Sequence, residues 1–391
     1  MTRRELIQSV LLAGISRGLP ASASPRPDTI VLMLDEKRVA ASQGIGFHLN
    51  PAKKHPENPV LLPGEPHQWD SLQVAWPATV LYSPKDRKFR CWYSGFDALQ
   101  KARKREIRPP GYAESEDGIH WRKPDLGQVT QDGYPTNRLQ PDWNIDGYAP
   151  TMLSHVFENR VPGAPASQRF GGDWLEEEVV GTGPKGKPES RRRFAWSPDG
   201  IRWTPAGLAF EQQGNACQVF YMRDADPESR FLGIAQVKRP RWDGRVVRNI
   251  GAMRGLTLES MKYPEDPIVL APEKGIDEEL HFASVSRVGD TFLMLFESNR
   301  FAKNPIHGDL RLAVSTDGRR FRRVHPRDAV VSTGAKGVWD ENLLAVSTLA
   351  MQAVGDEVYI FYVGCPNVFI SFPREYAPKG RRGLLLYPTY L

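Results

Sequence analysis

The chain has 391 residues, of which 40% are hydrophobic and 10% aromatic, so it can bury a large core and is neither a disordered chain nor a small disulfide scaffold. With 52 Lys plus Arg against 46 Asp plus Glu, its formal charge of +6 is only mildly basic. No apolar run approaches the ~18 residues that span a bilayer, so we expect no membrane insertion. The 34 glycines and 33 prolines are spread along the chain and indicate many turns between short strands, which favours an all-β fold.

The N-terminus has the pattern of an export signal. Arg3 and Arg4 precede a short apolar stretch, and Ala21-Ser22-Ala23 offers small residues to a signal peptidase. The pattern predicts a twin-arginine signal over residues 1–23, a folded domain over residues 24–391 and export to the periplasm or the cell exterior. The alternative is an ordinary basic first helix. We expect the protein to be a monomer.

The three cysteines, Cys91, Cys217 and Cys365, each lie in an apolar, strand-like run. An odd number in such positions predicts reduced core residues rather than disulfides, and no Cys/His cluster suggests zinc. We therefore expect no required cofactor and predict no metal site. A structural cation on a central axis is compatible with the sequence but is not predicted.

Five units of similar length follow one another along the chain. Each begins at an acidic or amide residue and continues through mixed apolar sequence to a charged turn and a second strand. The starts are Asp70, Asp146, Asn215, Glu279 and Asp340, so the intervals are 76, 69, 64 and 61 residues. Residues 158–192 interrupt the second unit as an insertion rich in Gly, Pro and charge.

Three of the units share the motif S-x-D-G-x-x-aromatic. Its copies are Ser115–Trp121, Ser197–Trp203 and Ser315–Phe321. Asp-Gly suits a tight turn, because Gly accepts a positive φ and Asp can bond its own backbone. Each copy therefore predicts the turn between the two outer strands of a small antiparallel sheet.

Five such units without a convincing amphipathic helix favour a five-bladed β-propeller over two stacked β-sandwiches. Two segments can supply a strand that closes the ring. One is Gly383-Leu384-Leu385-Leu386-Tyr387, and the other is Ile30-Val31-Leu32-Met33-Leu34 within residues 30–47. The sequence does not choose between them.

Several segments resemble the blades of five-bladed propellers in glycoside hydrolase families 32, 43 and 68 and their uncharacterised bacterial relatives. They are Tyr112–Pro124 and Leu310–Phe321, followed by Gly337–Asp340 and Gly355–Tyr359. The resemblance covers roughly residues 60–390 and implies this fold more specifically than any reaction. The sialidase Asp-box has one more residue between Asp and Gly, so a six-bladed sialidase is a lesser alternative.

The first strand of each blade lines the axial channel of a propeller, so the acids at the unit starts are expected to converge there. Carboxylates that share one funnel suit glycoside hydrolysis, because repulsion separates their pKa values into a proton donor and a base. The resemblance implies acids from the first three blades, and Asp70 and Asp146 match the first two. Asn215 stands in the third place and cannot donate a proton as a carboxylic acid.

We therefore predict Asp70 as base or nucleophile, Asp146 as the residue that orients or tunes the acid, and Glu279 as the proton donor. The alternative for each is a hydrogen-bonded turn residue. As a channel carboxylate, Asp70 should tolerate replacement by Asn without loss of folding. The predicted sugar-contacting residues are Trp69, Trp76, Asn215, Glu278, His281, Trp339, Asp340 and Glu341. For the tryptophans, the alternative is ordinary blade packing, and for His281 it is a satisfied core position or a ligand of an axial ion.

The predicted function is an exported glycoside hydrolase that acts on a plant or microbial poly- or oligosaccharide. The alternative is a non-catalytic glycan-binding propeller, which Asn215 favours. Basic clusters at residues 101–105, 191–193 and 319–323 are expected in solvated loops and turns, where they can attract an anionic glycan. They do not alternate with exposed aromatic residues, so we expect no nucleic-acid binding.

Overall fold

The computed structural model describes residues 32, 34, 39–41, 43–71, 73–96, 108–180, 188–209, 217–221, 229–300 and 307–365. Within these ranges the regular secondary structure is β, apart from the single 3-10 turn Ala166–Gln168. The prediction of an all-β fold is confirmed. The predicted signal segment and Asn215 lie outside the described residues.

Most strands form four antiparallel groups of four consecutive strands, which we call blades; the second and third are separate sheets, and the first and fourth belong to one ten-stranded sheet. The first blade contains β1 (Gln73–Ser83), β2 (Lys88–Phe96), β3 (Pro110–Ser115) and β4 (Trp121–Arg122). The second contains β7 (Tyr148–Glu158), β8 (Phe170–Glu178), β9 (Ser190–Ser197) and β10 (Thr204–Leu208). The interpretation of residues 158–192 as an insertion is wrong, because β8 and the start of β9 lie within this range as regular strands of the blade. The third contains β11 (Cys217–Tyr221), β12 (Phe231–Pro240), β13 (Val246–Gly255) and β14 (Ile268–Leu270). The fourth contains β15 (Glu279–Val288), β16 (Thr291–Arg300), β17 (His307–Ser315) and β18 (Arg322–Val324).

Two hairpins complete the described strands. β19 (Leu343–Val354) and β20 (Glu357–Cys365) follow the fourth blade. The short strands β5 (Thr130–Gln131) and β6 (Tyr134–Pro135) lie between the first and second blades.

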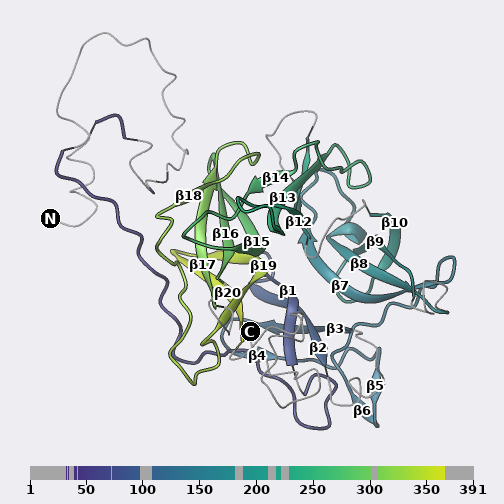
Figure 1. The fold of residues 1–391 in the computed structure, drawn as a ribbon. Coiled ribbons are helices and arrows are strands. Elements are labelled where there is room, and N and C mark those ends of the chain that lie inside the picture. The colour runs from purple at the N-terminus through teal and green to yellow at the C-terminus, as the bar shows by residue number, and fades with distance from the viewer. Residues whose placement is uncertain are drawn as a thin grey trace.

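The blades are arranged around a common axis as a β-propeller (Figure 1). The first strands of successive units contact one another, since β1 lies against β7, β7 against β11, and β15 against both the third blade and β19. β19 then pairs in parallel with β1 through Thr348 and Thr79, which closes the ring. The described residues hold four four-stranded blades and the β19–β20 hairpin, so the count of five blades stays a prediction.

The three S-x-D-G turns occupy equivalent places, between the third and fourth strands of the first, second and fourth blades. In each turn the glycine N–H donates to the serine Oγ, over 2.9, 2.7 and 2.9 Å in chain order. The aspartate Oδ1 accepts from the residue after the glycine. Each glycine has a positive φ, of +80°, +82° and +65°, which explains why the motif requires glycine there.

These turns also fix each blade to the one before it. The Trp92 indole N–H of the first blade donates to the Gly200 carbonyl in the second, over 2.7 Å. Arg254 of the third blade donates to the Asp317 carbonyl in the fourth, over 3.2 Å. The Gly118 turn of the first blade packs beside Phe361 of β20. The turns therefore hold the order of the blades around the axis.

The hydrophobic core lies between adjacent blades. Trp92 and Trp174 belong to the cluster between the first and second blades, and Leu232 and Phe296 to the one between the third and fourth. Cys91 is a fully buried free thiol, as predicted.

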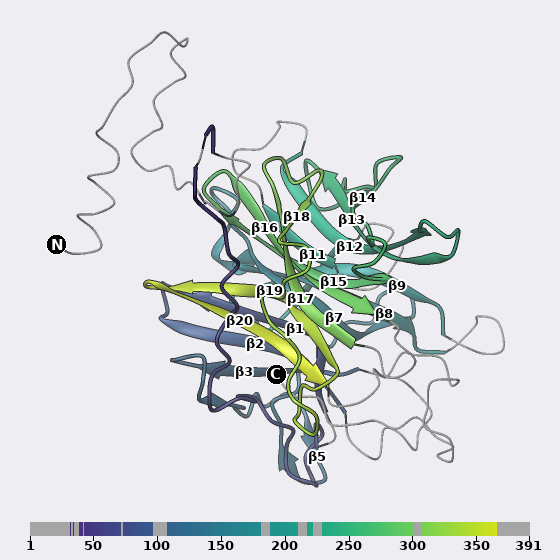
Figure 2. The same cartoon turned by 60° about the vertical axis from the view of Figure 1, so that its left-hand side comes forward.

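The N-terminal segment passes across the outer side of the β19–β20 hairpin (Figure 2). The Ala52 N–H donates to the Val330 carbonyl over 2.8 Å, and Lys54 forms an ion pair with Asp340 over 2.5 Å. The other candidate closing segment, Gly383–Tyr387, lies outside the described residues.

Candidate functional site

The first strands of the blades begin at one end of the propeller, where the antiparallel second strands finish. The predicted acids lie at or near this end, but they have different partners and different exposure. Of these acids, the structure brings Glu279 into one cluster with His281. A carboxylic acid of the second strand, Glu297, completes the cluster.

Glu279 is the first residue of β15, and only 6% of it is exposed. Arg248 of β13 donates from Nη1 to Glu279 Oε1 over 2.7 Å, across the boundary between the third and fourth blades. The same oxygen lies 4.0 Å from His281 Nε2. Glu279 is therefore a carboxylate with one cation beside it and an imidazole within reach.

Glu297 lies near the end of β16 and exposes none of its surface. The preceding run Phe292–Phe296 is apolar and largely buried, so the strand carries Glu297 into the interior. Its Oε1 lies 3.8 Å from His281 Nδ1, and neither oxygen accepts a hydrogen bond of good geometry from a described residue. Burial raises the pKa of Glu297 well above its usual value, and the nearby Asn299 and Arg248 offset only part of this.

His281 separates the two carboxyl groups. β15 is irregular between Leu280 and Ala283, and His281 lies in this irregular step. Burial, followed by the charge of Arg248, lowers the pKa of His281 to about 3, so the ring is neutral near pH 7. The cluster thus combines Glu297, whose raised pKa favours the protonated form, with a neutral imidazole and an arginine-paired Glu279. Two carboxyl groups with such different surroundings are the arrangement that supplies an acid and a base.

Asp70 lies in a different kind of site. It is 1% exposed, and its Oδ2 accepts from Lys123 Nζ over 2.5 Å and from the Tyr93 hydroxyl over 2.7 Å. Burial together with a cation and a hydroxyl at one oxygen is the environment of a structural carboxylate. Its role as base or nucleophile stays a prediction, and this environment disfavours it.

Asp340 repeats the arrangement of Asp70 in the β19–β20 hairpin. It is buried, and its Oδ2 accepts from Lys54 Nζ over 2.5 Å and from the Tyr362 hydroxyl over 3.0 Å. The predicted contact of Asp340 with sugar is therefore disfavoured for the same reason.

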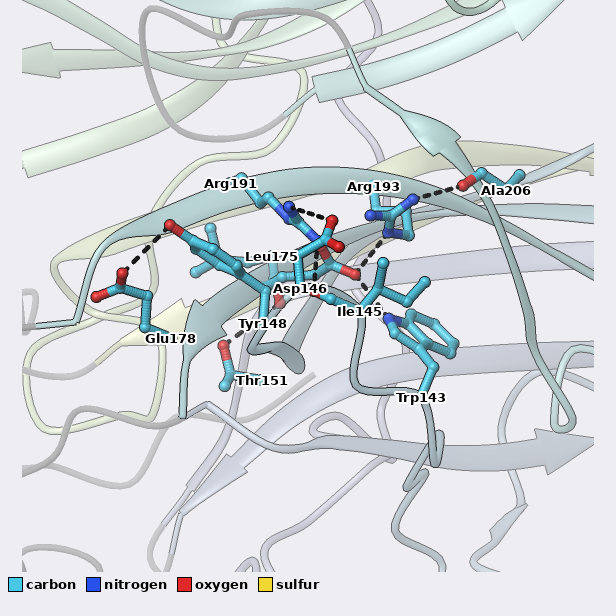
Figure 3. Close-up of polar contacts among 11 residues, drawn as sticks. Trp143, Ile145, Asp146, Tyr148, Thr151, Leu175, Glu178, Arg191, Arg193 and Ala206 are labelled. Carbon is cyan, nitrogen blue, oxygen red and sulfur yellow. Dashed lines mark hydrogen bonds and ion pairs between the residues drawn. The ribbon is translucent and has the colours of Figure 1, made fainter. Parts of the chain in front are cut away.

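Asp146 lies in an exposed turn, with a φ of +53° and 78% of its side chain exposed (Figure 3). Among the described residues, its ion-pair partner is Arg191, at 3.5 Å. This guanidinium also binds Glu176 over 2.7 Å and lies 4.2 Å from the centre of the Tyr148 ring. None of the described contacts joins Asp146 to Glu279. The structure thus places Asp146 at the rim, and its tuning role stays a prediction.

Two of the three predicted sugar-contacting tryptophans have described side chains, and each packs within its own unit. Trp69 is buried, stacks on Tyr93 with ring centres 5.7 Å apart, and donates to Asn137 over 2.8 Å. Trp339 stacks on Tyr362 at 5.5 Å. These contacts favour ordinary blade packing over a sugar platform. Trp76 lies in β1, but its side chain is outside the described part of the structure.

The remaining predicted residues make local contacts. The Glu278 N–H donates to the Asn299 carbonyl over 2.8 Å, and its own carbonyl accepts from Arg241 over 2.8 Å. Glu341 accepts from Asn342 over 3.0 Å and from the Gly337 N–H. These contacts neither support nor exclude a role in sugar binding.

Sequence reasoning missed three residues of the region, namely Glu297, Arg248 and Asp277. An acid that directly follows an apolar strand run was the available signal for Glu297. In the stretch Asp277–Glu279, Asp277 is the residue that repeats the role of Asp70. Its Oδ2 accepts from the Ser298 hydroxyl over 3.0 Å and pairs with Arg323 over 2.8 Å. Glu279 therefore does not take part in this structural ion pair.

One expectation about the basic clusters needs correction. Arg191, Arg192 and Arg193 lie in β9 rather than in a loop, and they pair with the buried acids Glu176 and Asp173. Burying these carboxylates requires cations beside them, so the cluster is largely neutralised. The segment 101–105 lies outside the described residues.

The described ranges contain neither a metal-binding cluster nor a membrane-spanning helix. They contain no group of three or more His, Cys, Asp or Glu side chains arranged to hold a metal ion. They also contain no helix that is long and apolar enough to cross a membrane.

No protein-family model matches the chain, and no curated protein matches its sequence. Solved structures match its fold. A putative glycosidase from Bacteroides thetaiotaomicron has a TM-score of 0.56 and 14% identity, over 81% of this chain and 93% of that one. A protein described with the GH130 family of mannoside phosphorylases, which contains glycoside hydrolases that target β-1,2-mannosidic linkages in Candida mannan, has a TM-score of 0.55 and 14% identity, over 81% and 90%. An N-acetylgalactosamine deacetylase from F. plautii, in complex with blood group B trisaccharide, has a TM-score of 0.51 and 16% identity, over 78% and 84%. At such identities the likeness shows the fold alone, which is a β-propeller shared with glycosidase-like proteins.

Proposed function

We propose that the chain is a glycoside hydrolase whose proton-transfer centre is Glu297, His281 and Glu279. The observation that carries the proposal is Glu297, a fully buried carboxylic acid with a raised pKa and no described lysine or arginine within ion-pairing distance. Such a group is costly for folding, and perturbed carboxyl groups of this kind concentrate at functional sites. The shared fold of the glycosidase-like structures supports the same reaction class.

In this proposal Glu297 is the acid that protonates the leaving oxygen of the glycosidic bond. Glu279, paired with Arg248, is the ionised partner that activates a water or attacks the sugar. Glu279, which the sequence predicted as the proton donor, is thereby reassigned as the base or nucleophile. Because Glu297 exposes no surface, substrate binding has to open the centre, and the closed form keeps bulk water away from the acid.

The test is turnover on a panel of aryl glycosides and polysaccharides, by the parent and by Glu297→Gln. Loss of a general acid is expected to lower kcat/KM by roughly 10²- to 10⁴-fold. The loss should be smaller for aryl glycosides with good leaving groups, because these need less protonation. Glu116→Gln is the matched control, since it makes the same substitution at an exposed acid outside the proposed centre and should leave turnover unchanged.

A parent protein that binds glycans without any turnover would support the glycan-binding alternative instead. Asp70 and Asp340 favour that alternative, because ion pairs already satisfy them and they supply no second open carboxylate. Full activity of Glu297→Gln would contradict the assignment of the acid.

We also propose that residues 1–23 direct export, on the strength of Arg3, Arg4 and Ala21-Ser22-Ala23. Sequencing of the mature N-terminus from the native host is expected to find a start near Ser24. Intact protein confined to the cytoplasm would contradict this.

A further inference from the structure

A cavity of about 530 Å³ runs along β20 on the outer side of the hairpin. Six consecutive residues of β20, Glu357–Tyr362, line one wall, and residues 52–55 of the N-terminal segment line the other. Side chains of a strand alternate between its two faces, so a cavity lined by six consecutive residues follows the strand's edge. Among the described residues, β20 pairs with β19 alone, whereas β2, β8, β12 and β16 each have a neighbour on both sides.

The hairpin repeats the first two strands of the first blade in detail. Trp339 and Asp340 correspond to Trp69 and Asp70, because each tryptophan stacks on a tyrosine that donates to the adjacent aspartate. The tyrosines are Tyr93 of β2 and Tyr362 of β20. Two residues after each tyrosine comes a glycine, Gly95 or Gly364, on which the tryptophan ring lies so closely that a Cβ would overlap it.

Residues of the N-terminal segment occupy the position of the outermost strand beside the hairpin. In the first blade Asp70 is paired by Lys123, which directly follows β4. In the hairpin Asp340 is paired by Lys54 of the N-terminal segment. Residues 52–54 therefore occupy the position of the fourth strand, and the cavity between them and β20 is the position of the third.

We propose that Gly383-Leu384-Leu385-Leu386-Tyr387 occupies this cavity as the third strand of a fifth blade, antiparallel to β20. In the first blade Trp69 lies against a second glycine, Gly111 of β3, which pairs with Tyr93. By the same geometry Trp339 needs a glycine opposite Tyr362, and Gly383 supplies it. The register then sets Val358 opposite Tyr387.

The burial of the other third strands fits the composition of this segment. Every residue of β3 is buried, and so are all but the first of β17. A strand covered on both faces needs a continuous apolar run, which Leu384–Leu386 provides. Two residues of the competing segment, Leu32 and Leu34, line a different pocket together with Thr291 and Phe321 of the fourth blade.

Disulfide trapping in the full-length protein tests the register. Directly opposed residues of antiparallel strands have Cα atoms ~4.5–5.5 Å apart, which is within the range of a disulfide. Val358 is 61% exposed, so Val358→Cys with Tyr387→Cys should not disturb folding. Mild oxidation is expected to join the two, with the link located by peptide mapping. The matched control is Val358→Cys with Leu386→Cys, in which the second cysteine points to the opposite face.

A link from Val358→Cys to Tyr387→Cys but not to Leu386→Cys supports the proposal. Equal linking of both pairs, or linking of neither, overturns it. Leu385→Asp gives a second measurement, because a charge in a strand covered on both faces is expected to lower Tm, and an unchanged Tm would also overturn the proposal. Neither readout depends on activity, so a failure here is distinct from a failure of the proposed glycosidase function.

Discussion

Asp70 and Glu297 are both buried carboxyl groups at the same end of the propeller, yet their surroundings are opposite. Asp70 receives a lysine and a tyrosine hydroxyl at one oxygen, within 2.5 and 2.7 Å. Glu297 receives no hydrogen bond of good geometry from a described residue, and its nearest described basic group is a neutral imidazole at 3.8 Å. The first arrangement stabilises the fold, and the second costs folding energy.

The difference teaches that an acid at a blade start is not by itself a sign of chemistry. The same contact recurs in three units, at Asp70, Asp277 and Asp340. In each, a carboxylate just before the first strand accepts a hydrogen bond from a hydroxyl of the second strand and forms an ion pair with a cation at the position of the outermost strand. Glu279 and Glu297 take no part in this recurring contact. Four measurements can break or sharpen this comparison.

Asp70→Asn is expected to destabilise the protein by about 3 kcal/mol, because it leaves the partly buried Lys123 without its counter-charge. This reverses the expectation that a channel residue tolerates the change. Urea unfolding measures the effect. Asp70→Asn combined with Lys123→Met should recover part of the loss, and full stability of the single variant would show that the ion pair is not structural.

His281 should make stability depend on acidity. Its pKa in the folded protein is about 3, against 6.5 for an ordinary histidine, so the unfolded chain takes up a proton first as the pH falls. Above pH 6.5 the ring is neutral in both states, and His281 does not lower the free energy of unfolding. As the pH falls from 6.5 towards 3, the free energy of unfolding decreases by about 1.4 kcal/mol per pH unit. His281→Gln should flatten the curve of unfolding free energy over this window.

His155 offers the matched control for that measurement. It is a buried histidine of the second blade whose pKa burial also lowers to about 3, and it lies outside the proposed centre. His155→Gln should flatten the pH curve similarly while leaving turnover unchanged. Equal loss of turnover in both variants would remove the distinction between the centre and the core.

Glu297→Gln should stabilise the protein at neutral pH, because burial raises the pKa of this acid above its ordinary 4.5. Below pH 4.5 the acid is protonated in both states, so parent and variant should be equally stable. As the pH rises further, the unfolded chain releases the proton first and the parent loses stability, on the order of 1–2 kcal/mol. Thermal unfolding at pH 4 and pH 8 measures this. A less stable variant at pH 8 would mean that Glu297 has a stabilising partner.

Asp146→Ala is expected to change the unfolding free energy by less than about 0.5 kcal/mol, because its contact with Arg191 is long and mostly exposed. Urea unfolding of parent and variant compares the two. A large loss would indicate that this rim residue anchors Arg191 and the buried Glu176.

The all-β class, the repeat and the place of each S-x-D-G turn were predictable from the sequence. The bonds that define the turn join Ser197, Asp199, Gly200 and their immediate neighbours. A structure whose hydrogen bonds close within four residues is determined by those residues, whatever surrounds them.

The identity of the site was decided by the tertiary structure. Asp277 and Glu279 are two residues apart and equally acidic, but Arg323 and Ser298 reach the first and Arg248 the second. Likewise, Glu297 is as buried as the strand acids Asp173 and Glu176 but has no described lysine or arginine within ion-pairing distance. Partners that lie tens of residues away decide whether a carboxylate is neutralised, because electrostatic and hydrogen-bond energies depend on distance in space and not on distance along the chain.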